Sequence, residues 1–148
     1  MSVTGLVHVN INCSDFERSI KFYELLGFQK AIDVPPQNTA EVAAAVGMSP
    51  DTVKGALLIL RNAKTPLMID LLEWQDPSDN HPPYPHLYHL GIARVALATD
   101  DLDSDVAFLK SHGVEFLSEP ATVRIGDQPA TRFVCFKDPD GTILELVE

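Results

Sequence analysis

The chain has little positive charge. Its 148 residues include 11 Lys and Arg against 21 Asp and Glu, which gives a formal net charge of −10 at pH 7. Proteins that bind nucleic acid usually carry a basic surface that meets the phosphates. The composition therefore argues against a nucleic-acid partner.

Long apolar runs and cysteines are also scarce. No stretch reaches the roughly 18 apolar residues of a membrane-spanning helix, and the opening MSVTGLVHVN lacks the basic and long apolar segments of a secretory signal peptide. Only Cys13 and Cys135 are present, both within strand-like segments. We therefore expect a cytoplasmic protein without a membrane partner and with two buried reduced thiols, a disulfide or reactive thiol being the less favoured alternative.

The C-terminal stretch RFVCFKDPDGTILELVE predicts a β-hairpin. Its two apolar arms flank Asp138-Pro139-Asp140-Gly141, in which proline restricts φ and glycine allows a positive φ. In the second arm Glu145 shares a strand face with Ile143 and Val147, because strand side chains alternate between faces. A carboxylate is costly to bury without a partner, so Glu145 is a candidate functional residue.

The first half of the chain predicts strands, two helices and a second carboxylate in an apolar strand. Gly5–Cys13 alternates, with His8, Asn10 and Asn12 on its polar face. Asp70 lies in the last strand of this half, and Trp74 shares its face. The expected strands are 5–13, 28–34, 53–61 and 66–74, and the expected helices are 15–26 and 38–47. The second helix is Ala-rich and is interpreted as an insertion, either a flap over a pocket or a packing element.

The second half repeats the first. With an offset of 86, His8 aligns with Arg94 and the following twenty positions align without a gap, including Asp15 on Asp101. We expect a strand at 90–99, a helix at 101–112 and a strand at 114–117, followed by the hairpin. A duplicated unit of this kind predicts two βαβββ modules.

These modules are expected to form one domain over 1–148. Module 1 covers 1–74, a Pro-rich connection covers 75–88, and module 2 covers 89–148. The expected fold class is α+β, with the two modules forming a cup-shaped open sheet and the helices outside. The inner face of the cup would then carry four polar side chains in a concave site, namely His8, Asp70, Arg94 and Glu145.

Three stretches resemble a known family. HVNINCSDFERSIKFYELLGF, ARVALATDDLDSDVAFLKSHGVEF and FKDPDGTILELVE are similar to the glyoxalase, bleomycin-resistance and extradiol-dioxygenase superfamily, also called vicinal oxygen chelate. The resemblance covers nearly the whole chain except 38–47 and the connection. It implies paired βαβββ modules, frequent homodimers, and a divalent metal held by the first and last strand of each module. The matching positions are His8, Asp70, Arg94 and Glu145.

Arg94 departs from that pattern, because metal-binding members usually have a second histidine there. A guanidinium stays protonated and has no lone pair to give a cation, and at about 4 Å it would repel a divalent ion by several kcal/mol at an effective dielectric near 20. His8, Asp70 and Glu145 would remain as a metal set for Fe, Mn or Zn. Arg94 makes this set doubtful, so the sequence favours no bound metal.

Arg94 has three alternative interpretations. It pairs with Asp70 and Glu145 in place of a metal, or it holds an anionic substrate group in a bidentate way, or it forms a buried pair without chemistry. In the second interpretation His8 is the acid or base. His8 and Glu145 are therefore the candidate catalytic residues, and the candidate substrate-binding residues are Arg94, Asp70, Asn10 and Trp74.

Two functions remain open at this point. The chain is expected to be an enzyme that acts on a small oxygenated metabolite by lyase, isomerase or ring-cleavage chemistry, in a homodimer. The alternative is a non-catalytic protein that binds a drug or antibiotic, as in the bleomycin-resistance branch. The residues do not identify the substrate or the reaction.

Overall fold

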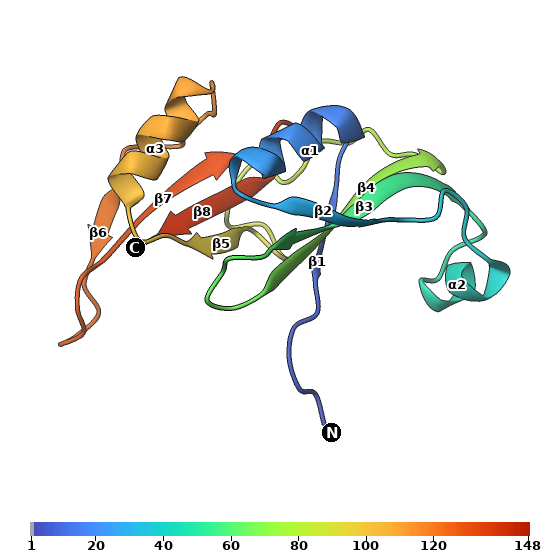
Figure 1. The fold of residues 1–148 in the computed structure, drawn as a ribbon, viewed down its shortest axis with the longest axis horizontal. Helices are drawn as coiled ribbons and strands as arrows, with labels where there is room; N and C mark the ends of the chain where they lie inside the picture. The colour runs from blue at the N-terminus through green and yellow to red at the C-terminus, as the bar shows by residue number, and fades with distance from the viewer. Residues whose placement is uncertain (1) are drawn as a thin grey trace. The chain divides into compact units, whose positions relative to one another are not determined.

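The computed structural model describes residues 2–148 (Figure 1). The chain divides into two units, residues 1–81 and 82–148. Each unit has a four-stranded open sheet with a helix packed on one face. The predicted α+β class and the duplicated βαβββ unit are confirmed. The joining of the two sheets into one cup, and the boundaries of a single domain, stay predictions.

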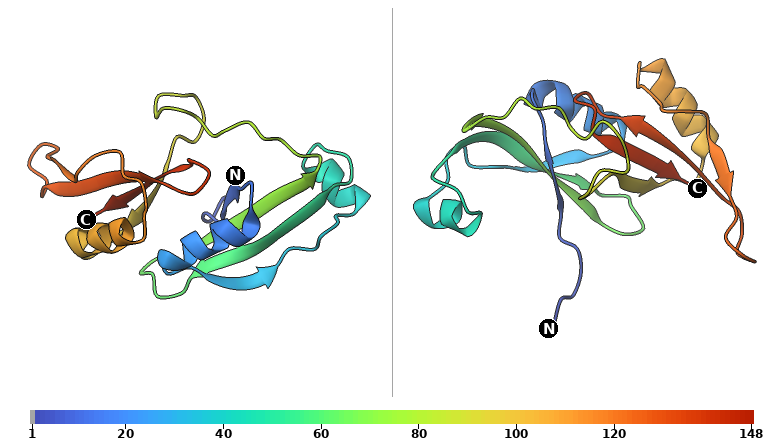
Figure 2. Two further views of the ribbon diagram at one scale, coloured as in Figure 1. Left: turned by 90° about the horizontal axis from the view of Figure 1, so that it is seen from above. Right: turned by 180° about the vertical axis from the view of Figure 1, so that it is seen from behind.

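The first unit contains six elements. They are β1 (Val9–Asn12), α1 (Phe16–Leu25), β2 (Gln29–Asp33), α2 (Ala40–Ala45), β3 (Thr52–Leu60) and β4 (Leu67–Asp76). The strand order is β1-β4-β3-β2, with β1 parallel to β4 and the other pairs antiparallel. In the left view of Figure 2, α1 lies over this sheet and points in much the same direction as its long strands.

The second unit repeats the arrangement without the inserted helix. It contains β5 (Val95–Ala98), α3 (Leu102–Ser111), β6 (Ala121–Val123), β7 (Thr131–Lys137) and β8 (Ile143–Val147). The order is β5-β8-β7-β6, with β5 parallel to β8. The C-terminal hairpin, β7 and β8, forms where the Asp-Pro-Asp-Gly turn predicts it.

Four predicted elements differ in the structure, and the first is the strand expected at 5–13, which is limited to β1. The strand expected at 114–117 is only a bridge between Phe116 and Phe136, and the edge strand resumes at β6. Pro120 lies in this gap and has no N–H for a sheet hydrogen bond. The strand expected at 90–99 is limited to β5. The helix expected at 38–47 is limited to α2, which Thr39 caps, and the Asn38 side chain makes hydrogen bonds with Asp51.

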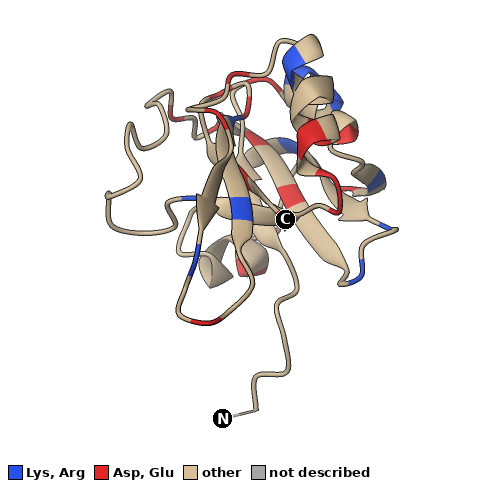
Figure 3. Cartoon of the chain, turned by 90° about the vertical axis from the view of Figure 1, so that its left-hand side faces the viewer, with Lys and Arg blue, Asp and Glu red and all other residues tan. Residues whose placement is uncertain are grey.

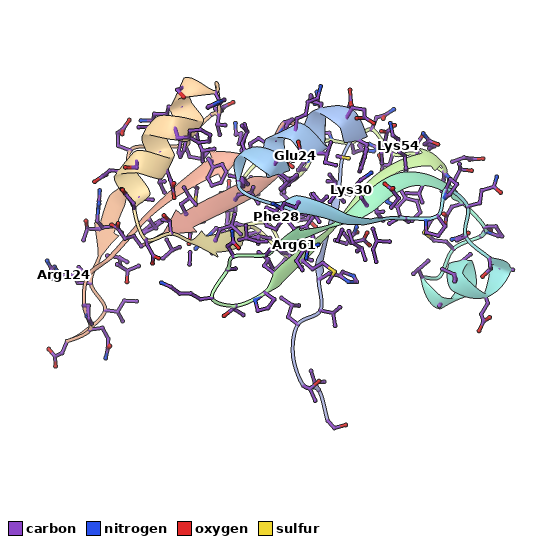
Figure 4. The ribbon with its side chains drawn as sticks, in the orientation of Figure 1. Glu24, Phe28, Lys30, Lys54, Arg61 and Arg124 are labelled. Carbon is purple, nitrogen blue, oxygen red and sulfur yellow. The ribbon has the colours of Figure 1, made fainter. Side chains whose placement is uncertain are left out.

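The core of each unit lies between its helix and one face of its sheet. In the first unit Tyr23 is fully buried and makes edge-to-face contacts with Phe22 and with Phe28, the latter labelled in Figure 4. The sheet contributes the buried residues Ala56, Leu58, Ile69 and Leu71. The second unit packs Leu102, Val106 and Leu109 against Val134, Phe136, Leu144 and Leu146. Burial of these side chains is the main stabilising term.

The start of each main helix is held in the same way. Asp15 and Asp101 are the N-caps and accept hydrogen bonds from Arg18 N and Ser104 N. Glu73 and Glu148, at equivalent positions of the repeat, accept from Phe16 N at 2.8 Å and Leu102 N at 3.2 Å. The sequence predicts that these two glutamates point outward, away from the expected cup. They are on the helix side of their sheets, and their role is to bind the helix ends.

The charged residues of α3 follow its dipole. Two aspartates lie in its first turn and a lysine in its last turn, and Figure 3 shows how such charges are spread over the chain. Acids near a helix start and bases near its end are both favourable.

No helix within residues 2–148 is long and apolar enough to cross a membrane.

Candidate functional site

The strand registers identify which face of each sheet is free of its helix. Asp70 pairs with Asn10 on β1 and with Leu57 on β3, whereas the flanking Ile69 and Leu71 are buried on the α1 side. Glu145 pairs with Ala96 on β5 and with Cys135 on β7. Both acids therefore lie on the sheet face opposite the helix, at equivalent positions of the two units.

Asp70 has an unpaired buried oxygen. Its Oδ1 atom is shielded from solvent and has no hydrogen-bond partner among residues 2–148, which is uncommon for a native carboxylate. Burial raises the pKa of the Asp70 carboxyl, and the charge of His8 lowers it by a smaller amount. His8 lies just before β1 and is exposed. His8 and Asp70, two of the predicted site residues, are therefore close enough to interact within the first unit.

Asn10 and Trp74 are fixed on the same face by hydrogen bonds. Asn10 Nδ2 donates to the backbone oxygen of Asp70 at 2.9 Å, and Trp74 Nε1 donates to Asn12 Oδ1 at 2.9 Å. The indole N–H is thus satisfied and the ring is held beside the polar row of β1. Asn12 is the residue that the sequence analysis leaves without a role, although the alternation of β1 places it on this face.

Arg94 is paired with Glu145 in the second unit. Its Nε lies 2.5 Å from Glu145 Oε2, and the exposed fraction is 43% for the Arg94 side chain but 9% for that of Glu145. The sequence predicts that Arg94 contacts Asp70 or Glu145, and within the second unit the contact is with Glu145. Arg94 is thus partly open to solvent, whereas Glu145 is buried.

Cys135 is a third member of this cluster that the sequence analysis did not include. Its Sγ donates to Glu145 Oε2 at 3.5 Å. Burial raises the pKa of the Cys135 thiol to about 11, with a further increase from the hydrogen bond and charge of Glu145, while Arg94 lowers it. The signal was available in the sequence, since equal distances from the hairpin turn place Cys135 opposite Glu145. Cys13 is also buried and reduced.

The donor chemistry of these residues does not fit a bound divalent metal. Arg94 has no lone pair, and it already occupies an oxygen of Glu145, one of the expected ligands. A cation at that carboxylate would lie beside a permanent positive charge. We therefore derive no step that uses a metal.

The fold and these faces define a class of protein: a duplicated βαβββ protein with polar residues on the free face of each sheet. Residues 5–146 match the Glyoxalase/Bleomycin resistance protein/Dioxygenase superfamily. The chain belongs to this superfamily, as its sequence predicts.

Two similar bacterial proteins are described as uncharacterized. The chain is 31% identical over 142 residues to the uncharacterized protein YaeR of Escherichia coli, covering 95% of this chain and 93% of that protein. It is 28% identical over 149 residues to the uncharacterized protein YwkD of Bacillus subtilis, covering 100% and 99%. A glyoxalase family protein from Bacillus cereus has a similar structure, with a TM-score of 0.78, 20% identity and coverage of 100% and 95%. At that identity the likeness concerns the fold alone.

Proposed function

We propose that this protein is a cytoplasmic enzyme that acts on a small oxygenated metabolite by proton transfer, without a metal. Of the three reaction types expected for the superfamily, lyase and isomerase chemistry suit this set of residues. Both can proceed by moving protons next to a carbonyl or hydroxyl group. Ring cleavage by oxygen needs redox chemistry that these side chains do not supply.

The observation that carries this proposal is the pairing of Arg94 with Glu145. Glu145 is bound to Arg94 and not to a metal ion, and the two charges neutralise each other. Substrate recognition therefore rests on hydrogen bonds. We propose Asp70, Asn10 and Trp74 as binding residues of the first unit, and His8, exposed and close to Asp70, as the group that moves the proton.

Glu145 has a different proposed role from the one in the sequence analysis. Its Oε2 is engaged by both Arg94 and Cys135, so it is a poor proton acceptor. We propose that Glu145 positions Arg94 and that His8 alone is the catalytic residue of the predicted pair.

The test begins with the ligand that the protein retains. Small molecules released by denaturing purified protein are identified by mass spectrometry and offered to wild type, His8→Ala and His112→Ala. His112 is another exposed histidine, hydrogen-bonded to Phe108 O, so it is the matched control. Conversion by wild type and His112→Ala but not by His8→Ala is the expected result. Undiminished conversion by His8→Ala would contradict the role of His8.

A second candidate function is a drug-binding protein without catalysis. It is favoured by Asp70 and Trp74 on one face, since an aromatic ring and a carboxylate together suit a cationic aromatic ligand. The same experiment separates the two functions. A released compound that wild-type protein binds but leaves unchanged would support the binding protein.

A further inference from the structure

The guanidinium of Arg94 has donors that the protein does not use. Its Nε is engaged by Glu145, and within residues 82–148 Arg94 makes no further hydrogen bond or ion pair. The other N–H groups are on Nη1 and Nη2, which together form the planar fork that matches a carboxylate. The side chain is 43% exposed, so a ligand can reach it.

The orientation of this fork is set in advance. Glu145 is buried and accepts from Arg94 and from Cys135. A guanidinium held by a buried carboxylate loses less conformational entropy when it binds a ligand than a free arginine does. Glu145 also neutralises the formal charge of Arg94, so binding there depends on hydrogen-bond geometry more than on net charge.

An apolar area continues from Arg94 along the same face of the sheet. On β5 the next two residues of this face are the exposed Ala96 and Ala98, whose small side chains leave room above the strand. Across the sheet Val147 is aligned with Ala98 and with Phe133, and both are partly exposed. The face thus offers an anion-binding fork at one end and an apolar shelf beside it, formed by Ala96, Ala98, Phe133 and Val147.

We propose that Arg94 and this apolar shelf bind a small monocarboxylate with an apolar body. The carboxylate accepts two hydrogen bonds from Nη1 and Nη2, and the body lies over the shelf. This inference rests on the proposed function, in which the protein binds a small molecule, and it adds the chemical class of that molecule. It requires no turnover.

The test uses benzoate, its neutral analogue benzamide and inorganic phosphate, with affinities measured by isothermal titration calorimetry. Wild-type protein should bind benzoate at least about tenfold more tightly than benzamide, because a charge-assisted bidentate pair is lost with the amide. Arg94→Ala should lose at least about tenfold in benzoate affinity. Phosphate binding tighter than benzoate binding would overturn the assignment to a carboxylate.

Two further variants keep the test decisive. Arg94→Lys keeps the positive charge beside Glu145 but lacks the fork, so it should fold and still bind benzoate weakly. Arg124→Ala removes one positive charge from an exposed arginine beyond β6, at the sheet edge opposite β5 (Figure 4), and should retain wild-type affinity. Equal benzoate affinity in wild type and Arg94→Lys, or no benzoate binding by wild type, would overturn the proposal.

The outcome is independent of catalysis. If benzoate binding fails while conversion still depends on His8, only the carboxylate assignment falls. If benzoate binding depends on Arg94 but no compound is converted, the carboxylate assignment stands and the catalytic proposal falls.

Discussion

At the scale of single residues, the two equivalent acids have different environments. Glu145 has an arginine and a thiol as partners, whereas Asp70 has a buried oxygen without any. A carboxylate left in this state costs free energy in the folded protein. An unpaired acceptor that the fold retains is a typical feature of a binding residue.

Replacing Asp70 by Asn should therefore stabilise the protein at pH 7. Burial raises the pKa of Asp70 above its ordinary value of 3.8, so the folded protein binds this proton more tightly than the unfolded chain does. Ionisation then destabilises the folded state at every pH above the raised pKa, and the penalty disappears below the ordinary value. The melting temperature of Asp70→Asn, measured by circular dichroism, should be a few degrees above that of wild type at pH 7. This difference in melting temperature should vanish at about pH 4.

The control for this measurement is Asp127→Asn, at an exposed position in the turn after β6. Its melting temperature should follow that of wild type at each pH. A lower melting temperature of Asp70→Asn at pH 7 would show that the carboxylate has a stabilising partner.

Cys135 should be a poor nucleophile at neutral pH. With a pKa of about 11, only about one thiol in a thousand is ionised at pH 8. Labelling by iodoacetamide, followed by peptide mass spectrometry, should be slow in wild type and faster in Glu145→Gln, because the negative charge that raises the thiol pKa is gone. Glu115→Gln, whose carboxylate bonds Lys137, should label like wild type. Equal rates in all three proteins would refute the thiol–carboxylate contact.

At the scale of elements, β3 and β4 leave no room for a side chain at Gly55. A Cβ added there would lie 2.5 Å from Leu72 Cδ2 and 2.6 Å from the backbone oxygen of Leu71. The second of these atoms cannot move aside without disturbing β4, the strand that carries Asp70.

Gly55→Ala should therefore destabilise the first unit by about 1–3 kcal/mol, the usual cost of overpacking. Urea unfolding measures this value. Gly5→Ala is the matched control, since a Cβ at Gly5 meets no atom within 4 Å. A Gly55→Ala variant as stable as wild type would mean that the two strands separate more easily than their register indicates.

The elements were largely predictable because their signals are local. Aspartate caps, glycine stops and the Asp-Pro-Asp-Gly turn each act within a few residues. The failures occur where a distant partner decides. The Asn38 side chain makes hydrogen bonds with Asp51, so α2 begins only after Thr39, which caps it.

The candidate site was predictable only in part, for the same reason. Alternation along a strand identifies the face of Asp70 and Glu145, and the hairpin register could have identified Cys135. Which carboxylate Arg94 contacts depends on rotamers of long side chains, and these leave no periodic pattern in a sequence. The roles of the site residues stay predictions.

At the scale of the whole molecule, we propose that the protein is a homodimer, as the family resemblance implies. The segment that precedes β5 exposes large apolar side chains, among them Leu90 at 89% and Ile92, and it contains no Lys, Arg, Asp or Glu from residue 80 to 93. In a chain with a net charge of −10, an uncharged apolar segment is the place where two copies repel each other least.

Sedimentation at micromolar concentration should give a mass of 32.4 kDa, twice the 16.2 kDa of one chain. Leu90→Asp should shift the protein toward the single-chain mass, because the change buries a charge at the contact. Ile125→Asp, at an equally apolar position exposed by 72% beyond β6, should leave the mass unchanged. A wild-type mass of 16.2 kDa would contradict the homodimer.

The pair formed by Arg94 and Glu145 also has a consequence for how such a protein changes over generations. Some arginine codons become histidine codons by one base change, and histidine is a lone-pair donor. The backbone hydrogen bonds between β5 and β8 do not involve the side chain at position 94, so the strand tolerates either residue. A gene that uses such a codon for Arg94 is therefore one mutation away from a histidine beside Glu145, and it can acquire that lone-pair donor without a new fold.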